Sequence, residues 1–137
     1  MLRFALCVLL IGLATTARSG PLDSFAGRYR GCAISGGEWV SIETVLSVSG
    51  DRLSGTYRFL EPSGRQVSGT VETDGSTVDG QVNLRWRDVY GDGPAVFNFS
   101  TDGSRFDGYW TTETGVDRFS WYGVRSGQMK DCQVPVS

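Results

Sequence analysis

The amino-acid sequence predicts an all-β protein, an eight-stranded antiparallel up-and-down meander barrel. Stretches in which apolar and polar residues alternate with a period of two follow one another along the chain, as half-buried strands do. Short turn signals rich in Gly, Asp and Ser separate them, and the chain shows no convincing amphipathic helix after its first residues. A cysteine near each end of this region, Cys32 and Cys132, suits a barrel whose first and last strands are neighbours.

The turn signals lie at 34–37, 49–51, 61–64, 74–76, 88–93, 101–104 and 113–116. They delimit eight expected strands, at about 25–33, 38–48, 52–60, 65–73, 77–87, 94–100, 105–112 and 117–125. Because every connection is short, consecutive strands should pair antiparallel. Eight such strands can close into a barrel, which removes exposed edges. A two-sheet β-sandwich is the alternative architecture.

Four segments repeat one glycine pattern, Gly-x-x-Φ-[Ser/Asp]-Gly, in which Φ is apolar: 50–55, 64–69, 75–80 and 103–108. The first glycine of each should supply the positive φ of a hairpin turn. The second falls within a strand and shares a face with apolar side chains. There it should let the strand bend and leave room for a large aromatic side chain from across the barrel.

Residues 1–17 have the pattern of a secretory signal peptide, with Arg3, an apolar run over 4–13, and small residues ending at Ala17. We therefore expect a single β-barrel domain over 18–137 in a secreted or periplasmic protein. The apolar run is too short to span a bilayer, and we expect no membrane insertion of the mature chain. Without Arg3, 12 basic residues face 15 acidic ones, a net charge of −3. A nucleic-acid-binding domain would be basic, so we expect no nucleic-acid partner.

In an exported chain, Cys32 and Cys132 are expected to form a disulfide. The chain contains no histidine, which excludes Ser-His-Asp and Cys-His catalysis and any His-ligated metal site. We expect no metal, no cofactor and no enzymatic activity. The acidic residues near Gly93 suggest a polar hairpin loop rather than a calcium loop. A carboxylate-dependent hydrolase remains a third hypothesis, with acids expected to ring the mouth of the barrel: Glu61, Asp92, Glu113 and Asp117.

The turns at one end, 34–37, 61–64, 88–93 and 113–116, are longer and less uniform than those at the other. Such loops tend to carry function, so this end is expected to be the open mouth. Alternation projects many aromatic side chains inward. They are candidate contacts for a small, largely apolar ligand: Tyr57, Phe59, Trp86, Tyr90, Phe97, Trp110, Phe119 and Trp121. Eight-stranded barrels can also be filled by side chains, so a solid aromatic core is the alternative.

The strand start Leu53-Ser54-Gly55-Thr56-Tyr57, with "FAGRYRGCAIS" at 25–35 and "WRDVY" at 86–90, resembles the avidin and streptavidin family. That resemblance implies a secreted eight-stranded barrel that binds a small molecule among tryptophans. Lipocalin-like barrels of the calycin type compare equally well in architecture. The resemblance implies that Tyr57, Trp86 and Ser35 match ligand contacts. Gly31 and Phe59 replace polar residues of the family's biotin site, which argues against biotin, because buried polar recognition needs each hydrogen bond.

The sequence thus favours an exported, non-enzymatic binding module that holds a small apolar ligand in the barrel mouth. The alternative is a protein-interaction or inhibitor barrel that contacts its partner through the 61–64, 88–93 and 113–116 loops.

Overall fold

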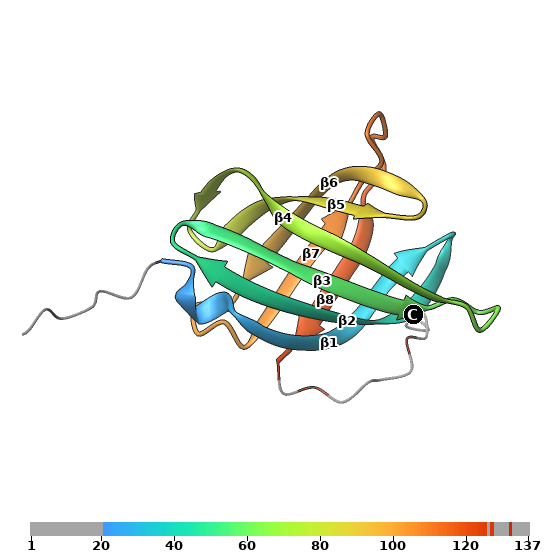
Figure 1. Cartoon of the computed structure of the whole chain (residues 1–137), viewed down its shortest axis with the longest axis horizontal. Helices are drawn as coiled ribbons and strands as arrows, with labels where there is room; N and C mark the ends of the chain where they lie inside the picture. Colours follow the sequence, from blue (N-terminus) through green and yellow to red (C-terminus); the bar gives the residue numbers. More distant parts are fainter. Residues whose placement is uncertain (1–20, 126, 128–131, 133–137) are drawn as a thin grey trace, which may run out of the picture.

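The computed structural model describes residues 21–125, Gly127 and Cys132. They form a closed antiparallel barrel in which each strand pairs with the next and β8 pairs with β1 (Figure 1). A short 3-10 helix, η1 (Asp23–Phe25), precedes the strands. These are β1 (Gly27–Ser35), β2 (Glu38–Ser49), β3 (Arg52–Leu60), β4 (Gln66–Val78), β5 (Gln81–Asp88), β6 (Gly91–Phe99), β7 (Arg105–Trp110) and β8 (Phe119–Val124). The eight-stranded meander barrel is confirmed, and the β-sandwich is wrong. The expected signal peptide lies outside the described residues.

The expected turn at 74–76 is wrong. Strand β4 continues through these residues to Val78, with a register shift between Thr73 and Thr77. The chain reverses instead at Asp79-Gly80, where both residues have positive φ, 47° and 82°. An Asp-Gly pair with this backbone suits the right-handed twist of a two-residue hairpin. Gly80 is therefore a turn residue and not the inward strand glycine expected from the repeat.

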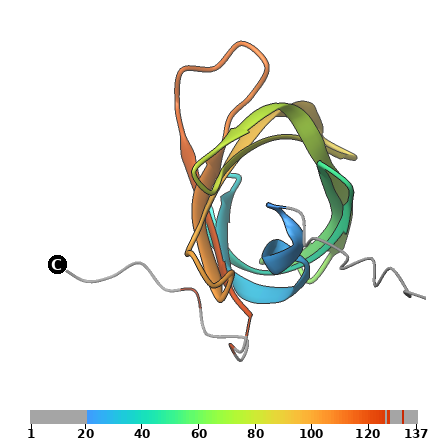
Figure 2. The same ribbon diagram turned by 90° about the vertical axis from the view of Figure 1, so that its left-hand side faces the viewer.

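Other strand ends also differ from the expected boundaries. Strand β5 runs to Asp88 and β6 begins at Gly91, which reduces the expected 88–93 loop to the two residues Val89 and Tyr90. The 111–118 connection between β7 and β8 is the longest of the described chain, and it projects from the barrel (Figures 1 and 2).

The first glycines of the four repeats all have positive φ, as expected: Gly50, Gly64, Gly75 and Gly103. The inward glycines have a different neighbour from the expected one. Each faces a large side chain on the adjacent strand rather than across the barrel, as in the pairs Tyr57–Gly69 and Phe97–Gly108. A Cβ on Gly69 would lie 2.3 Å from the Tyr57 ring. These glycines therefore let aromatic rings lie flat along the inner wall.

The end of the barrel that holds the β2–β3, β4–β5 and β6–β7 turns is closed. Helix η1 lies within the ring of strands at this end (Figure 2), and Phe25 stacks on Phe99 at 4.2 Å between ring centroids. The Tyr29 hydroxyl donates to the carbonyl oxygens of Phe25 and Gly103. The Arg125 side chain donates to the carbonyl oxygens of Ser24 and Ala26. It thereby fastens the helix to the last strand.

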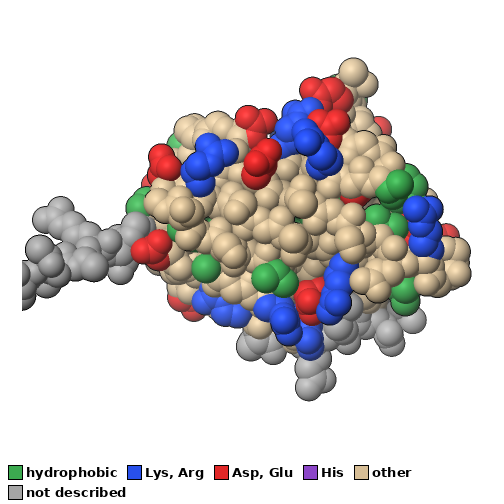
Figure 3. Space-filling view, in the orientation of Figure 1, with side chains coloured by type: hydrophobic (Ala, Val, Ile, Leu, Met, Phe, Trp, Pro, Cys, Tyr) green, Lys and Arg blue, Asp and Glu red, His purple; other side chains and the backbone are tan. Residues whose placement is uncertain are grey.

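The outer surface carries the disulfide, because Cys32 is directed away from the barrel interior and bonds Cys132, 100 residues later. A disulfide is typical of an oxidising compartment. On the same outer face, buried Glu43 forms ion pairs with Arg28, Arg30 and Arg58. Charged side chains of both signs are interspersed over the face in Figure 3. Within the described residues, no helix is long and apolar enough to cross a membrane.

Candidate functional site

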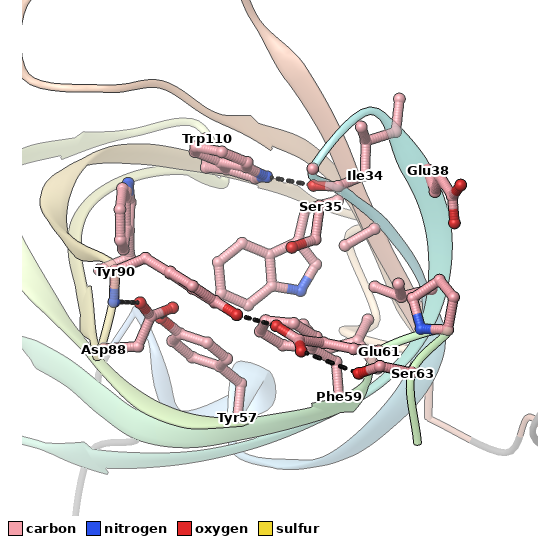
Figure 4. Close-up of a pocket in the computed structure, with 17 residues that line it drawn as sticks. Ile34, Ser35, Glu38, Tyr57, Phe59, Glu61, Ser63, Asp88, Tyr90 and Trp110 are labelled. Atoms are coloured by element: carbon pink, nitrogen blue, oxygen red, sulfur yellow. Dashed lines mark hydrogen bonds between the residues drawn. The ribbon is translucent and has the colours of Figure 1, made fainter. Parts of the chain in front are cut away.

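The half of the barrel opposite η1 is hollow. A cavity of about 590 Å³ opens between the β1–β2, β3–β4 and β5–β6 turns (Figure 4). The prediction of which end is open is therefore confirmed. The lining residues are Ala33, Ile34, Ser35, Gly36, Glu38, Val40, Ile42, Tyr57, Phe59, Glu61, Pro62, Ser63, Trp86, Asp88, Tyr90, Trp110 and Trp121. A filled core and a pocket are thus both present, one in each half of the interior.

A layer of aromatic rings separates the two halves. Phe97 stacks on Phe106 at 4.0 Å between ring centroids, and Trp121 packs edge-on against Phe97 at 4.8 Å. Trp121 also packs edge-on against Tyr57 at 4.8 Å. Because Trp121 and Tyr57 line the cavity while Phe97 is fully buried beneath them, the aromatic cluster forms the floor of the cavity.

The three tryptophans of the cavity are held by hydrogen bonds to the protein itself. Trp86 Nε1 donates to the Thr111 carbonyl at 2.9 Å, and Trp110 Nε1 donates to the Ile34 carbonyl at 2.8 Å. Trp121 Nε1 donates to Thr44 Oγ1 at 3.2 Å. Since a buried indole N–H needs a partner, these bonds fix the rings. They also leave none of the three indole N–H groups for a ligand.

Trp110 closes a seam in the barrel wall. The pairing of β8 with β1 ends at Ala33 and Trp121, so the last residues of β1 have no β8 partner. The hydrogen bond from the Trp110 indole to the Ile34 carbonyl crosses this gap (Figure 4). Trp110 also packs edge-on against Trp86 at 5.3 Å between centroids. One side of the mouth is therefore a wall of two indoles.

A chain of hydrogen bonds crosses the opposite side of the mouth. The Tyr57 hydroxyl donates to Asp88 Oδ2 at 2.7 Å, and the Tyr90 amide donates to Asp88 Oδ1 at 2.8 Å. The Tyr90 side chain reaches over the opening, and its hydroxyl donates to Glu61 (Figure 4). Ser63 Oγ donates to the other Glu61 oxygen at 3.4 Å. These bonds link the β3–β4 and β5–β6 turns across the cavity.

Both phenols in this chain hold their protons more tightly than usual. Burial, and then the hydrogen bond to Asp88, raises the pKa of Tyr57 far above its ordinary value. The hydrogen bond to Glu61 is the main cause that raises the pKa of Tyr90. Each hydroxyl therefore acts as a donor to its carboxylate at neutral pH.

The structure brings six of the eight candidate residues together around the cavity: Tyr57, Phe59, Trp86, Tyr90, Trp110 and Trp121. Phe97 does not line it, because it is fully buried beneath Trp121. Phe119 does not line it either and packs behind Trp110, at 4.6 Å between ring centroids. The role of the six residues as ligand contacts stays a prediction.

The acidic residues of the mouth differ from the expected set. Glu61 lines the cavity, but Asp92 and Glu113 form ion pairs with Arg85 and lie outside it. Asp117 is exposed and also outside. Sequence reasoning placed Asp88 in the 88–93 loop and missed it as a cavity residue, although it stands two residues after Trp86 and alternation places both on one face of β5.

No protein-family model and no curated protein matches this chain. These comparisons therefore do not show membership of the avidin or lipocalin families. The structure supports that resemblance in architecture alone, as an eight-stranded closed barrel.

Proposed function

We propose that this protein is an exported, non-enzymatic binding module that holds a small, largely apolar ligand in the open half of its barrel. The supporting observation is the cavity itself. Its volume, about 590 Å³, lies in the range of small-molecule sites, which are concave, mostly apolar and equipped with a few polar groups. Its walls are aromatic rings fixed by hydrogen bonds, so the site needs little ordering when a ligand enters.

The polar groups around the cavity support binding rather than catalysis. The chain has no histidine, and the two hydroxyls nearest the carboxylates are phenols that keep their protons. A phenol with a raised pKa is a poor nucleophile at neutral pH. The disulfide supports export, since such bonds persist in oxidising compartments.

We propose an avidin-like or lipocalin-like mode of binding, with a ligand other than biotin. Ser35, Tyr57 and Trp86, the residues that the resemblance assigns to ligand contacts, all line the cavity. Phe59 also lines it, with a ring in place of a hydroxyl. Gly31 has no room for a polar side chain, because a Cβ there would lie 2.0 Å from the Tyr122 carbonyl oxygen.

Titration with N-phenyl-1-naphthylamine, a neutral apolar dye whose fluorescence rises in apolar sites, tests this function. The wild-type protein should bind one dye molecule per chain. Trp86→Ala and Trp110→Ala should each weaken binding by about 10- to 100-fold, because each removes a large aromatic contact worth about 1.5–3 kcal/mol.

Trp39→Ala is the matched control. Trp39 lies on the outer face of β2, where it packs against Tyr122 at 6.1 Å between ring centroids, and its loss should leave dye affinity unchanged. The proposal fails if the wild-type protein does not bind the dye, or if the three tryptophan variants lose affinity equally.

The exposed apolar side chains at the open end favour a second candidate, a protein-interaction barrel. Val116 at the tip of the 111–118 loop is 93% exposed, Val89 is 64% exposed and Leu60 is 57% exposed. Hydrophobic side chains gather at this end of the molecule in Figure 3. Contiguous apolar patches are typical of protein-binding surfaces, so this candidate requires that the loop tips together form such a patch. It uses the loop tips, whereas the first candidate uses the cavity beneath them.

A further inference from the structure

The cavity carries negative charge and no positive charge. Its lining includes Glu38, Glu61 and Asp88 but no arginine and no lysine. Within the described part of the chain, no arginine forms an ion pair with any of these three carboxylates. Elsewhere on the barrel the carboxylates of Glu43 and Asp92 do have arginine partners. Among the described residues, the three carboxylates of the cavity thus have no ion-pair partner of their own.

Two of these carboxylates, Asp88 and Glu61, lie at the opening of the cavity. The Glu38 side chain points away from the centre of the cavity, whereas Asp88 and Glu61 stand at the opening beside Tyr57 and Tyr90 (Figure 4). Asp88 accepts from a phenol and from a backbone amide, and Glu61 accepts from a phenol and a serine hydroxyl. All four partners are neutral donors. In each of these hydrogen bonds the carboxylate is the acceptor, as an ionised carboxylate must be. The negative charge at the opening is hydrogen-bonded but not neutralised.

The aromatic walls add to the preference for a cation. The face of an indole or phenol ring attracts an ammonium group through its quadrupole, and Trp86, Trp110 and Tyr57 line this cavity. The cavity does not favour an anionic ligand, because the three indole N–H groups already donate to the protein and are not available to an anion. Arg65 is exposed in the β3–β4 turn and is absent from the lining.

From this arrangement we propose that the ligand is an amphiphilic cation, with a flat apolar body in the aromatic cavity and a protonated amine at the opening between Asp88 and Glu61. This inference rests on the proposed function and specifies its ligand class. Asp88 is the principal charge partner, because short hydrogen bonds of 2.7 and 2.8 Å hold both of its oxygens beside Tyr57 and Trp86, whereas the bond from Ser63 to Glu61 is 3.4 Å long. Glu61 and Tyr90 lie across the opening, so they would enclose the amine on its outer side.

Three indoles of similar size and different charge test the ligand class by isothermal titration calorimetry at neutral pH and low salt. They are tryptamine, a cation; 3-propylindole, which is neutral; and indole-3-propionate, an anion. Tryptamine should bind at least about 10-fold more tightly than 3-propylindole, and indole-3-propionate should bind most weakly. The advantage of tryptamine should shrink as salt is added, because salt screens charge attraction at a partly open site.

Variants of the two carboxylates then test which of them attracts the amine. Asp88→Asn should remove most of the preference for tryptamine over 3-propylindole, and Glu61→Gln should reduce it. Binding of 3-propylindole by each variant reports that the cavity is intact. Asp107→Asn, which removes an exposed acid from the outer face of β7, is the matched control and should keep the full preference.

The outcomes separate the two proposals. Equal binding of tryptamine and 3-propylindole by the wild-type protein overturns the cation preference and leaves the apolar binding function standing. A preference that survives in both Asp88→Asn and Glu61→Gln overturns the assignment of the carboxylates. Failure of all three indoles, together with failure of the neutral dye, overturns the proposed function as well.

Discussion

Tyr57 is the residue that joins the aromatic part of the cavity to its acidic rim. Its ring packs edge-on against Trp121 in the floor, lies over Gly69 on the adjacent strand, and ends in a hydroxyl bonded to Asp88. Glycine at 69 is what allows this position, since any side chain there would meet the ring. The carboxylate that we assign to amine binding is therefore oriented from within the barrel.

Ionisation of the buried Tyr57 phenol should make the free energy of unfolding depend on pH at alkaline pH. Its pKa is raised in the folded protein by burial and by Asp88, above about 10 for an unfolded tyrosine. A raised folded-state pKa contributes stability that is fully present below pH 10 and is lost as the pH rises further. In urea denaturation between pH 8 and 11, wild-type stability should fall more steeply than that of Tyr57→Phe. The difference should reach about 1.4 kcal/mol per pH unit, and parallel pH profiles would contradict this account.

Which side chains face the interior could be predicted from the sequence, because alternation in a strand is a local property. It placed Tyr57, Trp86 and Trp110 on the inner face, and these residues line the cavity. Their partners could not be predicted in the same way. The bond from Tyr90 to Glu61 joins residues 29 apart in sequence, and it depends on how two separate turns meet at the mouth.

At the scale of the elements, turn chemistry decided which predictions were right. The turns at Gly50, Gly64 and Gly103 lie where the sequence indicates, and each glycine has positive φ. The error at 74–76 arose because two turn-like segments, Asp74-Gly75 and Asp79-Gly80, stand close together. Both glycines have positive φ, but only the second pair reverses the chain. The first lies at an irregularity within β4, and local sequence does not distinguish the two uses.

Because Gly123 of β8 lies against the ring of Phe106 of β7, we expect substitutions at these two positions to have coupled effects on stability. A Cβ on Gly123 would lie 2.9 Å from the Phe106 ring and 2.8 Å from Tyr29 Cβ, so Gly123→Ala should overpack the core and lower the free energy of unfolding by about 1–3 kcal/mol. In a Phe106→Leu background the same change should cost less, by at least about 0.5 kcal/mol. Urea denaturation of the four proteins of this double-mutant cycle measures both values. Additive effects would show that Phe106 is not the group that glycine accommodates.

On the scale of the whole molecule, the barrel has one filled end and one end that holds the cavity. Helix η1, Tyr29 and Arg125 close one end, and stacked phenylalanines fill the interior behind them. The other end keeps its cavity because its aromatic side chains lie along the walls and are held there by hydrogen bonds to the backbone. The composition of the strands indicated an aromatic interior, but not that one half would be filled and the other open. That division depends on helix η1, which was not expected from the sequence; only its last residue, Phe25, fell within an expected strand.

The disulfide should contribute stability without contributing to binding, since it lies outside the barrel wall. It closes a segment with a sequence separation of 100, and removing it in the Cys32→Ala, Cys132→Ala double variant should lower the free energy of unfolding by about 2–5 kcal/mol. Dithiothreitol should lower wild-type stability by a similar amount and leave the double variant unchanged, which controls for the substitutions themselves. Affinity for N-phenyl-1-naphthylamine should stay within about 2-fold of wild type wherever the variant is folded, because neither cysteine lines the cavity. A folded double variant that no longer binds the dye would contradict this separation and show that the disulfide on the outer wall helps to shape the cavity.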